Sequence, residues 1–373
     1  MGNAGYAVVR NVANVAGVVL AGVADTRGES LEPFRDKRDV RLFDRVEEMC
    51  ASNEIDAVWI ATPNEFHAQH TITAANQGKH VILEKPMAVS LEECDRMIAA
   101  AEKNRIKLLM HSKVSEPPVV KMREVVASGR LGRVIQISTW NYKGWLDSAR
   151  LPSELDTTKG GGVLYRQGPH QIDIVRCIGG GMVKSVRGSV GRWNPCFDTE
   201  GNFTVLLEFE DGTPATLVFN GYGYFDITEL TWDIGEGGGK VTERYKKKER
   251  PKGPVDPAVR YAMPLRAETR KRDGNRKQPF YGLTLVSCER GDIRQSPDGL
   301  YLYTEEGKQE ILCESYLDRG QELVKLREAV GRGTPVFPDG RWGRASLEVA
   351  LAVLQSARER REIQLRCQVP IPQ

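Results

Sequence analysis

The spacing of hydrophobic and polar positions divides the chain into two parts. From Val18 to about Met110, short apolar runs alternate with segments of helical spacing, which is typical of a parallel sheet covered by helices. The expected strands are Val18–Ala24, Ala57–Ala61, His80–Leu83 and Lys107–Met110. The expected helices are Asn64–Asn76 and Leu91–Lys103, with Asn64 and Ser90 as N-caps. The pattern therefore predicts an α/β domain over residues 1–115.

A different rhythm follows a helix that we expect near Val119–Ala127. Four alternating runs separated by Gly, Asp and Pro predict strands, namely Val134–Tyr142, Val183–Arg192, Phe203–Glu210 and Ala215–Asn220. Asp211 and Gly212 join the last two and predict a hairpin. We expect an α+β domain with an open antiparallel sheet over residues 116–345. A C-terminal helix and tail over 346–373 should follow, since a helical pattern over Arg341–Arg361 begins near Ser346.

Composition agrees with two folded domains and narrows the partners. The 373 residues are 40% hydrophobic and 28% charged, with a net charge of +3, and one core usually holds ~100–200 residues. No run approaches the ~18 apolar residues that span a bilayer, and the first residues lack a signal-peptide pattern. We therefore expect a cytoplasmic protein with no membrane or nucleic-acid partner. Its seven dispersed cysteines are expected to be reduced and mostly buried.

One segment is strongly basic. Residues 240–277 hold 14 Lys or Arg and 5 Asp or Glu, a local excess of +9. One interpretation is an arm that contacts nucleic acid or a neighbouring subunit. A solvated loop is favoured, because no aromatic stacking pattern accompanies the charges.

The first residues match part of a dinucleotide-binding loop. Such a site needs an apolar strand and then a glycine turn that lets backbone N–H groups and a helix N-terminus meet the pyrophosphate. Gly2 and Gly5 fit the second and third glycines of G-x-G-x-x-G, and Asp25 lies 20 residues after Gly5, where a carboxylate binds the adenosine ribose. An ordinary flexible terminus is the alternative. Because no apolar strand precedes Gly2, we expect the first Rossmann strand to lie upstream of Met1.

Lys85 is the leading candidate for the reaction centre. It follows the apolar run His80–Leu83 directly, and Pro86 keeps its backbone out of a helix. A partly desolvated ammonium there has a lowered pKa and hydrogen-bonds a reacting oxygen as acid or base. A solvated surface lysine is the alternative.

Polar residues also mark the end of the preceding strand. Thr62, Pro63 and Asn64 end that strand and begin a helix, at the sheet edge where dinucleotides bind. His67 and His70 have the i, i+3 spacing of a metal pair, but no acidic or cysteine partner is evident, so we expect no metal.

A second candidate region runs from Gly160–Gly162 to Asp173. Pro169 after Gly168 suits the first position of a helix, so His170 and Asp173 fall three residues apart on one helix face and can approach one site. A structural histidine is the alternative. The spacing of His170 to Asp173, downstream of three glycines, favours a functional histidine.

Three of these segments, in order and at suitable spacing, resemble the Gfo/Idh/MocA family of nicotinamide-dependent oxidoreductases. They are Thr62–Asn64 with His67, Glu84–Pro86, and Gly160–Gly162 leading to His170 and Asp173. The resemblance covers essentially the whole chain and implies a Rossmann domain followed by an open antiparallel sheet. It also implies NAD as cofactor, bordered by Thr62, Pro63, Asn64, His67, Glu84, Lys85 and Pro86, and catalysis by Lys85, His170 and Asp173.

One position departs from the family pattern. Many relatives place Asp four residues before the histidine, where this chain has Arg166. Polyol binding by that Asp is therefore not expected, whereas a guanidinium pairs with a carboxylate through two hydrogen bonds. Arg150 is expected to supply a second positive group, with a surface-loop position as its alternative. Together the arginines favour a small anionic diol as substrate.

At a finer level, residues 154–176 and 340–363 resemble the phthalate dihydrodiol dehydrogenase branch of the family. That resemblance implies oxidation of a carboxylated aromatic cis-dihydrodiol to a catechol. A carbinol carbon gives hydride to the nicotinamide while Lys85 or His170 takes the hydroxyl proton.

Two other functions stay open. A sugar or polyol dehydrogenase of the same family would take a neutral substrate, and Arg166 argues against it. A non-catalytic, cofactor-sensing regulator would not need Lys85, His170 and Asp173. NADP is not excluded, because Arg27 near Asp25 can meet a 2′-phosphate. An exposed sheet face in the second domain predicts a homo-oligomer.

Overall fold

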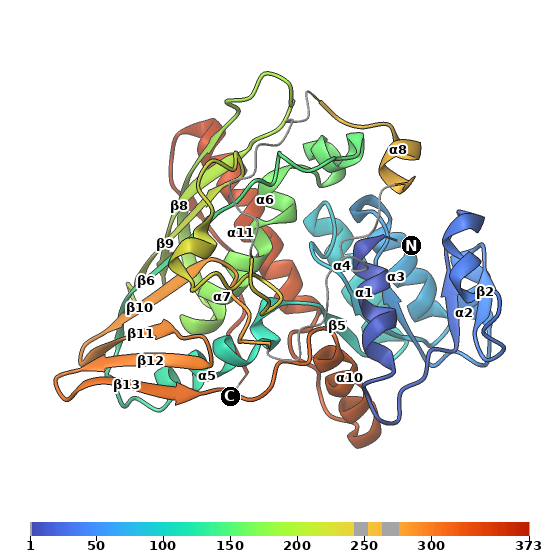
Figure 1. The fold of residues 1–373 in the computed structure, drawn as a ribbon, viewed down its shortest axis with the longest axis horizontal. Helices are drawn as coiled ribbons and strands as arrows, with labels where there is room; N and C mark the ends of the chain where they lie inside the picture. Colours follow the sequence, from blue (N-terminus) through green and yellow to red (C-terminus); the bar gives the residue numbers. More distant parts are fainter. Residues whose placement is uncertain (1, 242–252, 263–275, 373) are drawn as a thin grey trace. The chain divides into compact units, whose positions relative to one another are not determined.

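A computed structural model describes residues 2–241, 253–262 and 276–372. The chain divides into two compact units, each containing helices and strands (Figure 1). Unit 1 comprises residues 2–112 and 317–344, and unit 2 comprises the other described residues. The basic segment falls largely outside the described residues, so both interpretations of it remain predictions.

Unit 1 contains five short parallel strands in two sheets. Strands β1 (Gly22–Ala24) and β2 (Arg41–Phe43) pair with each other. Strands β3 (Ala57–Ile60), β4 (His80–Leu83) and β5 (Leu108–Met110) form the second sheet in that order. The expected first strand was too long, since only its last three residues pair with a neighbour. Strands β4 and β5 lie among the most buried residues, as expected for parallel strands covered by helices.

Four helices of unit 1 connect or precede these strands: α1 (Asn3–Val12), α2 (Val46–Ala51), α3 (His67–Asn76) and α4 (Leu91–Lys103). The cap at Ser90 is confirmed, because its hydroxyl accepts a hydrogen bond from the Glu93 N–H at 3.2 Å. The cap at Asn64 was wrong. A 3₁₀ turn over Asn64–Phe66 precedes α3, and α3 has no side-chain cap.

A late segment of the chain returns to unit 1. Helix α10 (Gly320–Arg332) places Leu326 in a core cluster with Ile82 of β4 and Leu109 of β5. Fully burying one side chain of this size contributes ~1.5–3 kcal/mol to the stability of the fold. Residues 317–344 therefore group with the first domain, although the hydrophobic pattern had placed 116–345 in the second.

Unit 2 is built on one nine-stranded sheet with the order β13-β12-β11-β10-β6-β9-β8-β7-β14. The predicted strands are present as β6 (Val134–Tyr142), β7 (Val183–Gly191), β8 (Asn202–Phe209) and β9 (Pro214–Asn220). The expected hairpin joins β8 and β9, and Gly212 in its turn has a φ of +85° that favours glycine. The sheet is mixed, because β6 and β9 run parallel while the other neighbours are antiparallel.

Alternation along the strands gives the sheet two different faces. In β8, Phe203, Val205, Leu207 and Phe209 are buried, while Leu206 between them is 50% exposed. Helices α5 (Pro117–Ala127), α7 (Gly168–Ile178) and α11 (Gly340–Glu359) lie against one face of the sheet (Figure 1). Helix α11 begins six residues earlier than the sequence pattern indicated, at Gly340 rather than Ser346.

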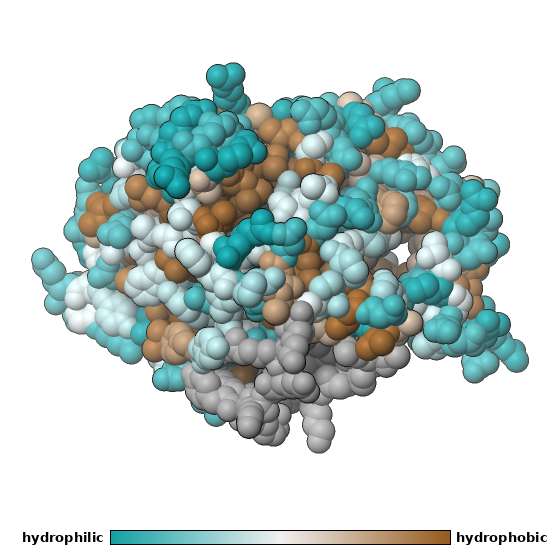
Figure 2. Space-filling view, turned by 90° about the horizontal axis from the view of Figure 1, so that it is seen from above, coloured by the Kyte–Doolittle hydropathy of each residue, from teal (hydrophilic) through white to brown (hydrophobic). Residues whose placement is uncertain are grey.

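Four strands of this sheet have no counterpart among the predicted ones: β10 (Leu283–Cys288), β11 (Gly291–Gln295), β12 (Gly299–Thr304) and β13 (Gly307–Leu312). A short strand, β14 (Ile363–Gln364), closes the other edge. Figure 2 shows hydrophobic side chains interrupting a mainly hydrophilic surface, as is usual for folded domains. Within the described residues, no helix combines the length and apolarity needed to cross a membrane. The seven cysteines are free, and four are buried.

Candidate active site

The start of α1 has room for a ligand. Gly2 precedes the helix in an extended conformation, and its carbonyl accepts a hydrogen bond from the Tyr6 N–H at 3.1 Å. A Cβ built on Gly2 would meet no atom within 4 Å among the described residues other than its chain neighbours. The first N–H groups of a helix lack partners within the helix and attract anions. This arrangement fits the pyrophosphate of a dinucleotide, although Gly5 lies within α1 rather than in a loop.

Asp25 follows β1, as the sequence predicted, and it is held by Arg27. Its Oδ1 accepts hydrogen bonds from the Arg27 backbone N–H at 2.9 Å and from Arg27 Nε at 3.2 Å, and Oδ2 accepts from Nη2 at 3.1 Å. A ribose hydroxyl bound by Asp25 would share this carboxylate with the guanidinium. The pair therefore presents both the acidic group that suits NAD and the basic group that suits a 2′-phosphate.

His67 joins the two turns that the sequence singled out. The ring is fully buried, with Nδ1 2.8 Å from the Pro86 carbonyl oxygen and Nε2 3.0 Å from the Thr62 carbonyl oxygen. Burial lowers the pKa of His67, and the two carbonyls oppose that shift. Thr62 Oγ1 also lies 3.0 Å from Nδ1 of His70. His67 thus connects the end of β3 to the turn after β4, and its two ring nitrogens are engaged by the backbone.

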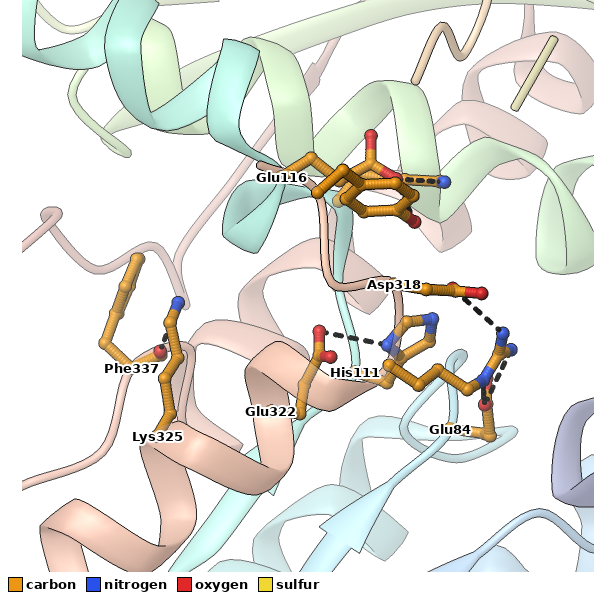
Figure 3. Close-up of polar contacts among 10 residues, drawn as sticks. Glu84, His111, Glu116, Asp318, Glu322, Lys325 and Phe337 are labelled. Carbon is orange, nitrogen blue, oxygen red and sulfur yellow. Dashed lines mark hydrogen bonds and ion pairs between the residues drawn. The ribbon is translucent and has the colours of Figure 1, made fainter. Parts of the chain in front are cut away.

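Glu84, immediately before Lys85, is buried and paired with a residue from the far end of the chain. Its Oε1 accepts hydrogen bonds from Arg319 Nε at 3.1 Å and Nη2 at 3.0 Å. Figure 3 shows Glu84 and Asp318 on two sides of this guanidinium, and His111 directed at Glu322. Burial raises the pKa of Glu84, but nearby positive charge, chiefly that of Arg319, lowers it overall to about 2.

The segment Gly160–Gly162 in unit 2 lies close to the buried carboxylate of Glu200. Glu200 Oε1 accepts a hydrogen bond from the Leu164 N–H at 3.0 Å, and Glu200 is 4% exposed. Gly162 has a φ of +86°, and a Cβ there would lie 2.3 Å from that same oxygen. Burial raises the pKa of Glu200. The glycines therefore allow the chain to pass close to Glu200 just before His170.

His170 lies at the start of α7 against an aromatic ring. Its ring centroid is 4.5 Å from that of Tyr281, which burial keeps protonated by raising its pKa well above the usual value. The Tyr281 hydroxyl contacts Gln167 at the carbonyl oxygen, 3.0 Å away, and at Oε1, 2.9 Å away. The ammonium groups of Lys113 and Lys143 lie 5.8 and 5.0 Å from the centre of the Tyr281 ring. Each of these ammonium groups is paired with a carboxylate, Lys113 with Glu116 and Lys143 with Glu236, so their charge near the Tyr281 ring is largely balanced.

Asp173, one turn further along α7, takes part in a buried network. Ser346 of α11 donates a hydrogen bond to Asp173 Oδ1, and Arg176 Nη1 donates to the same Ser346 hydroxyl at 2.8 Å. Arg176 is fully buried and also binds Gln368 Oε1 at 2.9 Å. Burial lowers the pKa of Arg176 to about 10, against an opposing effect from Asp173. This network stabilises unit 2 whether or not Asp173 also contacts substrate.

Arg150 and Arg166 share one carboxylate. Glu154 Oε1 lies 2.9 Å from Arg166 Nη2 and 3.6 Å from Arg150 Nη1. Burial raises the pKa of Glu154, but Arg166 and Arg150 lower it overall, helped by Arg260 of α8 (Pro257–Ala262). Arg150 is pinned 4.1 Å above the Trp145 ring. The pair of arginines with Glu154 carries a net charge of +1, smaller than two separate arginines would give.

Known proteins resemble this chain over most of its length. Residues 1–112 match the oxidoreductase family with an NAD-binding Rossmann fold, and residues 119–230 match the GFO/IDH/MocA C-terminal domain. A 1-carboxy-3-chloro-3,4-dihydroxycyclohexa-1,5-diene dehydrogenase of Comamonas testosteroni is 30% identical over 358 residues, covering 91% of this chain and 89% of the relative. The chain belongs to the Gfo/Idh/MocA family.

Solved structures agree with the Gfo/Idh/MocA fold. One from Bordetella bronchiseptica RB50, described as a presumed dehydrogenase, is 34% identical with a TM-score of 0.83, covering 96% of this chain and 95% of that one. An aldose-aldose oxidoreductase of Caulobacter crescentus, at 20% identity and a TM-score of 0.71, covers 96% and 95% and shares the fold. The expected fold class and the NAD-dependent dehydrogenase activity are thereby confirmed.

Within this Gfo/Idh/MocA protein, the predicted site residues lie in both units. Lys85, Glu84, His67 and Thr62 cluster at the carboxyl ends of β3 and β4 in unit 1. Residues of unit 2 include His170, Asp173, Arg150 and Arg166. Their catalytic and binding roles stay predictions. Sequence reasoning missed Arg319, Glu200 and Tyr281, because their partners lie far away in the chain. It also missed Glu154, although Arg150 is only four residues away.

Proposed function

We propose that this dehydrogenase oxidises a small carboxylated cis-dihydrodiol and transfers its hydride to NAD. The observation that carries the proposal is the Arg150–Glu154–Arg166 group, in which two guanidiniums face a single carboxylate. The remaining positive charge suits an anionic substrate. The activity named for the Comamonas testosteroni relative, on a carboxylated dihydroxycyclohexadiene, supports the same substrate class.

The chemistry divides between the cofactor and the protein. NAD, when bound, accepts a hydride from the carbinol carbon of the substrate. The C–H bond of that carbon breaks, its hydroxyl oxygen becomes a carbonyl, and the hydroxyl proton passes to Lys85 or His170 as general base. The resulting hydroxydienone is an isomer of the catechol, and it aromatises when the remaining carbinol carbon loses its proton and the carbonyl oxygen gains one. Arg166 would hold the carboxylate, while the Tyr281 ring supports the imidazole of His170.

The proposal is tested by following reduced cofactor when the protein meets NAD and a carboxylated aromatic cis-dihydrodiol. Turnover of this substrate, with little turnover of the same dihydrodiol without its carboxylate, is the expected result. Turnover of glucose or inositol instead would identify a sugar or polyol dehydrogenase. Binding of NAD without turnover of any diol or sugar would favour a regulator.

Arg166→Ala should raise KM for the carboxylated substrate by about 10–100-fold, because a hydrogen bond to a charged group contributes ~1.5–3 kcal/mol. The KM for NAD should not change, since the substitution lies in unit 2, outside the NAD-binding Rossmann domain. Initial rates at varied substrate and varied NAD measure both constants. Arg192→Ala, at a side chain that is 57% exposed on the same unit, is the matched control. Equal loss toward the dihydrodiol without a carboxylate would contradict the proposed role of Arg166.

A further inference from the structure

Glu84 lies where its charge acts on Lys85. The two residues are consecutive, and the Glu84 backbone N–H is fixed by a hydrogen bond to the Ile60 carbonyl at 3.0 Å. The Glu84 side chain is 8% exposed, so little water screens its charge. Lys85 in turn contributes to the electrostatic environment of Glu84. A positive group that pairs with the Glu84 carboxylate therefore changes the electrostatic environment of the Lys85 amine.

Charged and titratable groups face this pair from three elements. Arg319, Asp318 and Glu322 come from the start of α10, His111 from the end of β5, and His67 from α3. Arg319 makes two hydrogen bonds to Glu84 Oε1. On the other side of the guanidinium, Asp318 Oδ1 lies 3.9 Å from Arg319 Nη1. His111 pairs with Glu322 at 3.1 Å. Arg319 is the residue whose hydrogen bonds occupy the Glu84 carboxylate (Figure 3).

The Glu84 carboxylate bears on the acid–base role proposed for Lys85. A general base must release its proton near the working pH, and an unpaired carboxylate beside an amine stabilises the charged ammonium instead, shifting its pKa by ~1–3 units. Glu84 stays ionised throughout the neutral range, because its pKa of about 2 lies below the usual value. Its charge is therefore constant during an assay, and only its pairing can vary.

We infer that Arg319 is a positioning residue of the reaction centre, which holds the Glu84 carboxylate and so leaves the Lys85 amine able to give up its proton. The inference rests on the proposed function in one respect, that Lys85 is the acid–base group. No sequence signal near Lys85 points to Arg319, which lies 235 residues from Glu84.

The test is a charge cycle read out by pH. In Arg319→Gln, the limb of kcat/KM that reports Lys85 should move to higher pH by ~1 unit or more, because Glu84 is left unpaired. Glu84→Gln should move the limb to lower pH. The double variant should return toward the wild-type position, since both charges are then gone. Arg319→Lys, which keeps the charge, should stay near wild type.

A substrate-independent measurement separates this inference from the proposed function. Trace labelling by acetic anhydride across a pH series, with the Lys85 peptide quantified by mass spectrometry, gives the pKa of the amine without turnover. The same order of shifts is expected. Shifts in labelling without oxidation of any dihydrodiol would uphold the inference and defeat the proposed substrate.

Unchanged labelling and an unchanged kinetic limb in Arg319→Gln would overturn the inference, and would leave Arg319 a purely structural residue. A merely structural Arg319 also predicts lower stability in the single and double variants with no return of the limb. If Arg319→Gln fails to fold, the inference is tested with Glu84→Gln and Arg319→Lys instead. A labelling pKa in Glu84→Gln that equals the wild-type value then overturns the inference.

Discussion

Replacing Lys85 by methionine is expected to lower kcat by about 10²–10⁴-fold, the range by which positioned acid–base groups accelerate reactions. Methionine keeps a long apolar side chain after β4, so the backbone of the Glu84–Pro86 turn should survive. It cannot carry the hydroxyl proton of the substrate. Stopped-flow or steady-state formation of reduced NAD with the carboxylated dihydrodiol measures the loss.

The affinity for NAD should persist in Lys85→Met, because the other expected NAD contacts, at the start of α1 and at the turn held by His67, do not involve the Lys85 side chain. Titration of NAD by calorimetry checks this point. Lys103→Met, at an exposed position at the end of α4 in the same unit, is the matched control and should turn over normally. A kcat in Lys85→Met equal to that of the control would remove Lys85 from the chemistry and transfer the acid–base role to His170.

Arg176→Met should reduce the free energy of unfolding by ~3–5 kcal/mol, the usual cost of leaving a buried charge without the opposite charge near it. The guanidinium is fully buried, and its hydrogen bonds to Ser346 and Gln368 join α7 to α11 and to the C-terminal tail. Its loss leaves Asp173 without that positive charge. Urea unfolding followed by tryptophan fluorescence measures the change.

Two further variants test whether the stability lost in Arg176→Met comes from the buried network or from the loss of any positive charge. The double variant Arg176→Met/Asp173→Asn should recover part of the stability, because no buried carboxylate is then left without the guanidinium. Arg358→Met, at a side chain of α11 that is 77% exposed, should change stability by less than about 1 kcal/mol. Equal stability losses for Arg176→Met and Arg358→Met would contradict a buried network of this strength.

Local signals predicted those parts of the fold that carry their own pattern. The alternation in Val134–Tyr142 matched β6 at both ends, and Gly168 with Pro169 located the start of α7. The strands from Leu283 to Leu312 were missed, although Leu283–Cys288 alternates between buried and partly buried positions in the same way as the strands that were predicted. Asn64 was misplaced as a cap because a 3₁₀ turn intervenes before α3, and residues 317–344 were misplaced because a helical pattern does not reveal which sheet it covers.

The candidate site shows the same limit. Motif spacing located Lys85, His170 and the turn at Thr62, since each follows a strand or opens a helix within a few residues. Spacing did not indicate that Glu154 would lie between Arg150 and Arg166, and so the predicted positive charge was overestimated. Glu154 lies in a short 3₁₀ turn only four residues after Arg150, and no regular hydrophobic pattern in this loop indicated that the two side chains would meet.

The sequence alone determined the two-domain α/β organisation, the resemblance to the Gfo/Idh/MocA family and the position of Lys85 after a buried strand, because these depend on short-range patterns that each segment carries by itself. The tertiary structure decided what surrounds those residues. It brought Arg319 to Glu84, closed the glycine segment around Glu200, and tied Asp173 to Ser346 and Arg176. The physical reason is that a buried charge is stable only with a partner, and that partner is brought close by the packing of distant helices and strands.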